Sequence, residues 1–318
     1  MSDLQKLVAA EIATPVDPRV AVMGAALAGT YPDAARAVLF YGSCLRTAEL
    51  DGLMLDFYLI VSDYRAAYGK SWLAAANRLV PPNVFPFAHD GLAAKYAVLS
   101  EADFQKLCGP EASAVSVWAR FAQPSRLVWA ADQAARDAAV AAIARAPETL
   151  LALTPAGADP DPLDRWRRGF TLTYGAELRA ERGGRPGSIV DFDPARYRAF
   201  GDALHTPHSP CHHRESGDPS SSSSDRKGKK KVDSRFRGND NEEELDRKWR
   251  SLRRTGKWIT LVRLAKASLT FAGGIDYLAW KINRHAGTAI AIRPWQRRFP
   301  ILGAITLLPR LLARGAVR

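Results

Sequence analysis

Cysteine is scarce in this chain of 318 residues, which has three of them, Cys44, Cys108 and Cys211, far apart in the sequence. A disulfide framework needs more cysteines at closer spacing, so the count favours a reducing compartment. No window has the roughly 18 uncharged apolar residues that a membrane-spanning helix needs. The first residues also lack the pattern of a secretory signal, a basic segment followed by an apolar core and a cleavage site. We therefore expect a cytoplasmic protein.

Acidic residues are outnumbered: there are 33 Asp and Glu against 45 Lys and Arg, and the formal net charge is +12. This balance favours an anionic partner, which includes nucleotides, nucleic acids and acidic membrane surfaces. No acidic residue follows Asp276. The segment after it mixes arginines with aromatic and leucine side chains, which predicts an amphipathic helix in the membrane interface. The alternative is a core-packing helix with exposed arginines.

Two apolar runs lie on either side of a Gly-Ser pair near residue 42. Residues 38–41 read as a buried strand that ends at Gly42-Ser43, and residues 53–61 read as a second buried strand that contains Asp56. Glycine lets the backbone approach a phosphate closely, serine offers a hydroxyl and an N–H, and the carboxylate could hold Mg²⁺. This combination indicates a nucleotidyltransferase site. The alternative is an ordinary turn beside an edge-strand aspartate.

A second carboxylate is missing at the expected place. In nucleotidyltransferases of the polymerase-β superfold, the Gly-Ser turn is followed by paired carboxylates that bind metal, but the residue two positions after Asp56 is Tyr58. Asp51 and Asp63 are the candidates to complete the metal site. Lys95, in a predicted third strand over residues 91–100, is either a cation for the triphosphate or a lysine at a strand edge.

The remaining sequence predicts helices over residues 1–14, 65–79 and 101–107, and alanine-rich helical sequence dominates from residue 130. We therefore divide the chain into a nucleotidyltransferase domain (1–130), a mainly helical domain (131–204) and a helical C-terminal region (245–318) that ends in the basic amphipathic tail. Residues 205–244 are rich in Ser, Pro and Lys and have almost nothing to bury, so they predict a disordered low-complexity insertion. Its histidines and cysteine are close together, but in this setting we expect only adventitious metal binding (His205, His208, Cys211, His212 and His213).

Several stretches together resemble one family. They are Tyr41-Gly42-Ser43, Leu55-Asp56-Phe57 with Val61-Ser62-Asp63, Trp72 and Asn77 before Pro81-Pro82-Asn83, Lys95-Tyr96-Ala97-Val98-Leu99-Ser100, and residues 118–124. The combination is similar to the mitochondrial-type CDP-diacylglycerol synthases, also called the translocator assembly and maintenance phosphatidate cytidylyltransferases, which have bacterial members. The similarity covers most of residues 30–130. Two places depart from the family pattern: Ala97 replaces a glycine, and Phe121-Ala122-Gln123-Pro124 replaces a Gly-Arg-Leu-x-Lys-Pro run.

The resemblance implies an α/β (α+β) fold, with a polymerase-β-like nucleotidyltransferase domain before the helical regions. It implies an Mg²⁺-dependent enzyme that converts CTP and phosphatidic acid to CDP-diacylglycerol and pyrophosphate. This enzyme would be peripherally bound to the inner face of the cell membrane. The expected partners are CTP, phosphatidic acid and an anionic membrane surface, with no nucleic acid. The alternatives are a nucleotidyltransferase acting on RNA or protein, and a decayed, non-catalytic membrane-associated relative.

Specific residues take roles under this resemblance. Asp56, Ser43 and Lys95 are the expected catalytic residues. The nucleotide would be bound by Tyr41, Gly42, Ser43, Lys95 and Tyr96. The metal would be held by Asp56 with help from Asp51 or Asp63.

Overall fold

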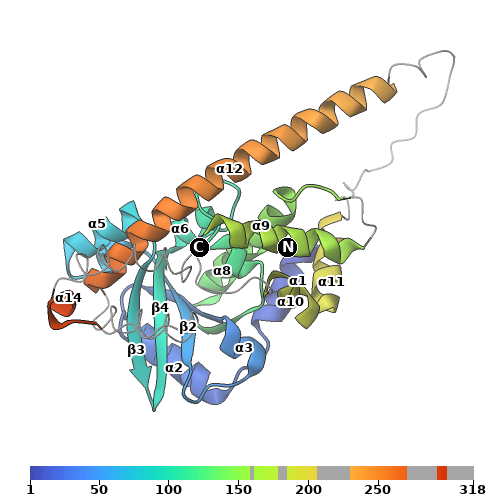
Figure 1. The fold of residues 1–318 in the computed structure, drawn as a ribbon. Coiled ribbons are helices and arrows are strands. Elements are labelled where there is room, and N and C mark those ends of the chain that lie inside the picture. Colours follow the sequence, from blue (N-terminus) through green and yellow to red (C-terminus); the bar gives the residue numbers. More distant parts are fainter. Residues whose placement is uncertain (158–160, 178–184, 206–229, 271–291, 299–318) are drawn as a thin grey trace, which may run out of the picture.

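A five-stranded mixed sheet forms the centre of the molecule, seen in a computed structural model that describes residues 1–157, 161–177, 185–205, 230–270 and 292–298 (Figure 1). The strand order is β3-β4-β2-β1-β5. The strands are β1 (Ala35–Tyr41), β2 (Met54–Val61), β3 (Asn83–His89), β4 (Leu92–Ser100) and β5 (Ser125–Ala130). The β2 and β4 strands are parallel, and the other neighbours are antiparallel.

Both faces of the sheet are buried, which explains why its central strands read as continuous apolar runs. Side chains alternate along β2: Tyr58 and Ile60 lie in one core cluster, whereas Phe57 and Leu59 lie in the other. The first face, which carries Tyr58, packs against α1 (Asp3–Ile12), α6 (Glu101–Leu107), α7 (Trp118–Phe121) and α8 (Gln133–Ala152). The second face packs against α2 (Pro18–Gly29), α4 (Tyr64–Ala67) and α5 (Ser71–Leu79).

Local signals set several of these boundaries. Ser2 and Gln5 form a capping box at the start of α1, and Asp17 caps α2 just before Pro18. Ser100 accepts a hydrogen bond from the Asp103 N–H and starts α6 directly after β4. The predicted helices over 1–14 and 101–107 and the predicted strand over 91–100 are therefore confirmed, with boundaries shifted by one to two residues.

Four C-terminal helices contribute buried side chains to the core cluster of the first face: α9 (Pro162–Ala176), α10 (Arg185–Phe192), α11 (Pro194–His205) and the long α12 (Lys230–Thr270). A short helix, α14 (Pro294–Arg298), follows later in the chain. In Figure 1, α12 runs past α9 and β3. Its Trp249 is buried and donates a 2.6 Å hydrogen bond from Nε1 to the Leu153 carbonyl. Gly256 allows close packing on α9, because a Cβ there would stand 2.3 Å from the Ala176 carbonyl oxygen.

One of the two core clusters joins the sheet to these helices. One cluster of buried side chains extends from Leu4 in α1 through the first face to Leu252 in α12. The α8 helix and the helices α9 to α12 thus share a core cluster with the sheet, and the domain boundary at residue 130 stays a prediction. The mixed α/β class is confirmed.

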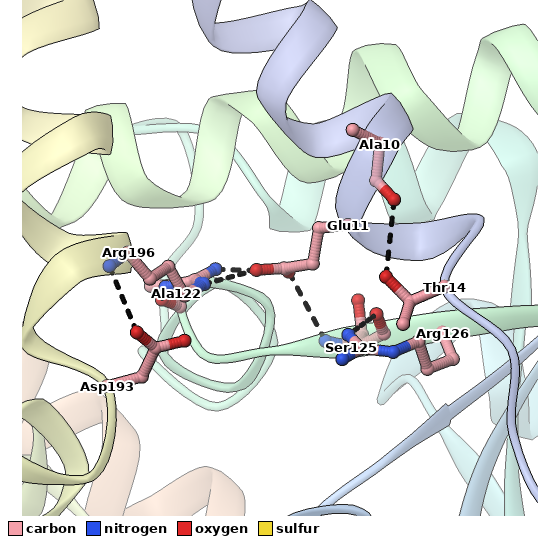
Figure 2. A network of polar contacts seen from close by, with 8 residues as sticks. All are labelled: Ala10, Glu11, Thr14, Ala122, Ser125, Arg126, Asp193 and Arg196. Carbon is pink, nitrogen blue, oxygen red and sulfur yellow. Dashed lines mark hydrogen bonds and ion pairs between the residues drawn. The ribbon is translucent and has the colours of Figure 1, made fainter.

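An ion pair ties the N-terminal helix to a late one (Figure 2). Arg196 in α11 is 5% exposed and pairs with Glu11 in α1, which is 11% exposed. The same guanidinium donates a 3.0 Å hydrogen bond to the Ala122 carbonyl, which lies between α7 and β5. Three segments far apart in the sequence are thus held at one point.

Other expectations need correction. The helix predicted over 65–79 is two helices, α4 and α5, because the chain is extended at Tyr68 and Lys70. Residues 230–244, which we predicted to be disordered, lie in α12. His205, the first residue of the predicted insertion, ends α11, and residues 206–229 are outside the described residues. Residues 277–291 and 299–318 of the predicted tail are also outside them. Within the described ranges, no helix is long and apolar enough to cross a membrane.

Candidate active site

The candidate site lies on the first face of the sheet, where β2 and β4 begin. Because these strands are parallel and in register, Asp56 and Lys95 are neighbours. Lys95 Nζ forms an ion pair with Asp56 Oδ1 at 2.7 Å. The Asp56 side chain is 19% exposed and the Lys95 side chain is 26% exposed. A carboxylate and an ammonium group therefore meet at a partly solvated strand end, where a charged ligand has access. The structure confirms that these two predicted residues come together.

The Gly-Ser turn closes one side of this pair. Tyr41 at the end of β1 is in register with Asp56, so the following residue, Gly42, stands over the carboxylate. Gly42 has φ +96°, and a Cβ at that position would lie 3.0 Å from Asp56 Oδ2. Both the backbone conformation and the close approach require glycine here. Ser43 follows as the first, exposed residue of the short helix α3 (Ser43–Thr47).

Aromatic side chains form the floor of the site. The Tyr41 ring lies 5.2 Å from the Tyr58 ring, which is itself 5.1 Å from the Phe121 ring, measured between centroids. Burial, and next the charge of Asp56, raises the pKa of Tyr41 well above its ordinary value, so this hydroxyl is a neutral hydrogen-bonding group. Tyr58 occupies the place of the second carboxylate, and its side chain is part of the core.

Arg120 in α7 is a site residue that the sequence reasoning missed. It interacts with Asp56, Tyr41 and Tyr58, and it donates a hydrogen bond to the Ser116 carbonyl. Burial opposes its charge, but these neighbours and Glu177 more than compensate and raise the pKa of the guanidinium. The available signal was a lone arginine among buried residues between Trp118 and Phe121.

Three predicted site residues are not brought to Asp56. Tyr96 points to the opposite face, where its hydroxyl bonds the Tyr31 hydroxyl at 2.9 Å; adjacent residues of a strand face opposite ways, so Lys95 and Tyr96 cannot share one pocket. Asp63 caps α4 beyond the far end of β2, about 23 Å away along the strand. Asp51 is 81% exposed and pairs with Arg19 of α2 at 2.9 Å.

The donor set fits a magnesium ion that arrives with a nucleotide. Mg²⁺ commonly binds one or two protein carboxylates together with substrate phosphates and water. The carboxylate available here is Asp56, and Ser43 follows the Gly42 turn that packs against it. Among the described residues, no group of three His, Cys, Asp or Glu side chains forms a metal site. Most ligands of an ion at Asp56 would therefore have to be nucleotide oxygens.

One departure from the family pattern has a visible consequence. Gln123 stands where the resemblance expects a lysine, and its side-chain oxygen accepts a 3.2 Å hydrogen bond from Arg46 of α3. Gln123 thus braces the helix that follows the Gly-Ser turn. Any cation for a phosphate on this side of the site has to come from another residue.

Comparison with known proteins adds no assignment. No protein-family model matches the chain, and no curated protein matches it significantly.

Proposed function

We propose that this protein is a phosphatidate cytidylyltransferase, which transfers the cytidylyl group of CTP to phosphatidic acid. The observation that carries the proposal is the Gly42 turn packed against the Asp56–Lys95 pair. Three groups lie together at one strand end: a glycine backbone that a phosphate can approach, the Asp56 carboxylate and the Lys95 ammonium group. Nucleotidyl transfer needs groups of these kinds. The choice of CTP and a lipid acceptor follows from the resemblance of residues 30–130.

The reaction needs positioning rather than a general base. An anionic oxygen of the phosphatidate phosphate attacks the α-phosphorus of CTP and forms a new P–O bond. The bond from that phosphorus to the bridging oxygen breaks, and pyrophosphate leaves with the electron pair. No proton has to move, since the attacking oxygen is already ionised, so the protein contributes by alignment and charge neutralisation.

Each site residue has a role in this scheme. Gly42 and Ser43 place backbone and hydroxyl groups beside the triphosphate. Lys95 leaves Asp56 in part to neutralise phosphate oxygens. A Mg²⁺ ion held by Asp56 and the nucleotide would supply Lewis-acid stabilisation of the charge that develops on the phosphates.

A lipid substrate places the protein at a membrane surface, and we propose the inner face of the cell membrane. The net charge of +12 favours attraction to anionic lipids. On α12 and α14, Trp258 is 71% exposed and Trp295 is 42% exposed. Exposed tryptophans are typical of surfaces that dip into the membrane interface.

The second candidate is a nucleotide-binding relative without catalysis, and Tyr58 favours it. A tyrosine buried between Tyr41 and Phe121 cannot bind a second metal ion. Under this alternative the chain would bind CTP but turn over no acceptor.

The test is CDP-diacylglycerol formation from phosphatidate vesicles with each of the four nucleoside triphosphates and Mg²⁺, with RNA as a competing acceptor. We expect turnover with CTP and phosphatidate, and a loss on the order of 100-fold for Asp56→Asn. Asp51→Asn is the matched control and should keep its activity, because Asp51 pairs with Arg19 at an exposed position. Equal activity of the wild type and Asp56→Asn would overturn the assignment, and CTP binding without product would favour the second candidate.

A further inference from the structure

One row of side chains crosses the first face of the sheet at the candidate active site. Tyr41 of β1, Asp56 of β2 and Lys95 of β4 are register partners on neighbouring strands. All three lie on the face that carries Tyr58, because side chains two residues apart on a strand share a face. Asp56 therefore has a neighbour on each side, Lys95 on one strand and Tyr41 on the other.

Arg120 of α7 belongs to the surroundings of this row. The next residue, Phe121, has its ring 6.1 Å from the Tyr41 ring and 5.1 Å from the Tyr58 ring, measured between centroids, so α7 packs against the row. Arg120 acts on the Tyr41 hydroxyl through its charge and as a hydrogen-bond donor. Its charge also acts on Asp56. The Tyr41 hydroxyl is thus a common neighbour of the guanidinium and the carboxylate.

Arg120 is itself held in place. It donates from Nη1 to the Ser116 carbonyl, one helical turn earlier in the chain. Ser116 is 4% exposed, and its hydroxyl accepts a 2.6 Å hydrogen bond from Nη1 of Arg263 in α12. Arg263 also donates to the Pro81 carbonyl at 2.8 Å. A side chain that orients another group has to be fixed by packing and hydrogen bonds of this kind.

The proposed reaction gives Asp56 a need for such a neighbour. Lys95 pairs with Asp56 Oδ1 at 2.7 Å, but in that scheme it turns in part to the phosphates. A carboxylate that holds Mg²⁺ in one geometry needs a partner that stays, because hydrogen bonds from outside the ligand set orient metal ligands. The Tyr41 hydroxyl has one proton to donate, and since its oxygen accepts from Arg120, that proton is left for another acceptor. Asp56 is the carboxylate that acts on Tyr41.

We propose that Arg120 is a positioning residue, which orients the Tyr41 hydroxyl and through it the Asp56 carboxylate for a Mg²⁺ ion that arrives with the nucleotide. This inference rests on the proposed function and adds a residue to the metal side of that site. It divides the work of two cations: Lys95 serves the phosphates, and Arg120 serves the carboxylate. An arginine suits this role because a guanidinium stays charged and carries a rigid, planar set of donors.

The experiment is a double-mutant cycle of Arg120→Gln and Tyr41→Phe in the full chain, with Arg120→Lys and the control Arg165→Gln. Arg165 in α9 is also half-buried, and it donates to the carbonyls of Thr154 and Leu151 away from the row. The Kd for CTP is measured by calorimetry in EDTA and in saturating Mg²⁺, and urea unfolding reports stability. The ratio of the Kd in EDTA to the Kd in Mg²⁺ gives the contribution of the metal to nucleotide binding.

Arg120→Gln and Tyr41→Phe should each lower this ratio about tenfold and leave the Kd in EDTA within about twofold of the wild type. The double variant should also lose about tenfold, rather than the roughly 100-fold expected of independent residues. Arg120→Lys should recover part of the ratio, since it restores the charge. Arg165→Gln should lose stability and keep the ratio.

Three results would overturn the inference. The first is an unchanged ratio in Arg120→Gln. The second is an additive loss in the double variant, which would show that Arg120 does not act through Tyr41. The third is a loss of CTP affinity that is equal in EDTA and in Mg²⁺, because a role in the fold or in holding the nucleotide alone would lower both.

Failure of the proposed function gives a different result. If the wild type makes no CDP-diacylglycerol, but Mg²⁺ strengthens its binding of CTP and Arg120→Gln loses this effect, the acceptor is wrong and the positioning role stands. If the wild type makes the product and Arg120→Gln keeps the full metal effect, the reaction stands and the positioning role is wrong. If Mg²⁺ does not strengthen CTP binding in the wild type, the inference is wrong whatever the product.

Discussion

The ion pair of Arg196 and Glu11 predicts a large stability effect for a residue outside the candidate active site (Figure 2). The change to make is Arg196→Met, which keeps most of the apolar stem and removes the guanidinium. The guanidinium also lies 4.1 Å from the centroid of the Phe200 ring, and it bonds the Ala122 carbonyl. Its loss therefore leaves the Ala122 carbonyl without its Arg196 donor and the Glu11 carboxylate without its ion-pair partner, with the Ser125 N–H still donating to Glu11 at 3.4 Å.

The magnitude follows from burial. Breaking a buried ion pair by removing one partner costs about 3–5 kcal/mol of unfolding free energy, because the other charge stays buried and uncompensated. The Glu11 side chain is 11% exposed, so water can offset little of this cost. The double variant Glu11→Met with Arg196→Met should lose much less than Arg196→Met alone, since replacing both partners by apolar groups is often nearly neutral.

The assay is urea unfolding followed by tryptophan fluorescence, and the midpoint of Arg196→Met should fall by about 1 M or more. Arg167→Met is the matched control, because Arg167 pairs with Asp161 and Asp191 at a more exposed place. The Arg167 side chain is 34% exposed, and those of Asp161 and Asp191 are 40% and 55% exposed. An exposed pair of this kind is worth about 1 kcal/mol at most. If Arg196→Met loses no more stability than Arg167→Met, or if the double variant is as unstable as the single one, the reasoning from burial is refuted.

Two further predictions concern the site and its rim. Gly42→Ala should lower turnover at least about tenfold, because a Cβ there would stand 3.0 Å from Asp56 Oδ2. Gly52→Ala is the control: Gly52 also has a positive φ, but nothing lies within 4 Å of its Cβ, so this variant should lose only about 1 kcal/mol of stability. Equal turnover in the two variants would contradict the steric argument. Burial and Arg263 hold the pKa of Lys266 at about 7, below the 10.5 of an ordinary lysine, so between these values the unfolded chain binds more protons and wild-type stability should rise with pH. Lys266→Met should lose this rise in urea unfolding from pH 7 to 10, and parallel curves for the two proteins would show that Lys266 does not titrate in this way.

The sequence determined those features that depend on neighbours in the chain. Capping residues placed the starts of α1 and α6, and apolar runs placed β1, β2 and β4, because caps and side-chain alternation act over a few residues. The Gly42-Ser43 turn and Asp56 were found in the same way. Alternation could also have shown that Tyr96 faces away from Lys95. The length of the apolar run could have shown that Asp63 lies at the end of β2 opposite to Asp56.

Only the tertiary structure decided which charges meet. Lys95 reaches Asp56 because β4 pairs in parallel with β2, and no local pattern sets that strand order. Arg120 and Arg263 come together because α12 packs across α9 and β3 onto the same core. Those contacts join residues far apart in the chain, so they depend on the burial of the whole apolar surface, which no short window of sequence contains.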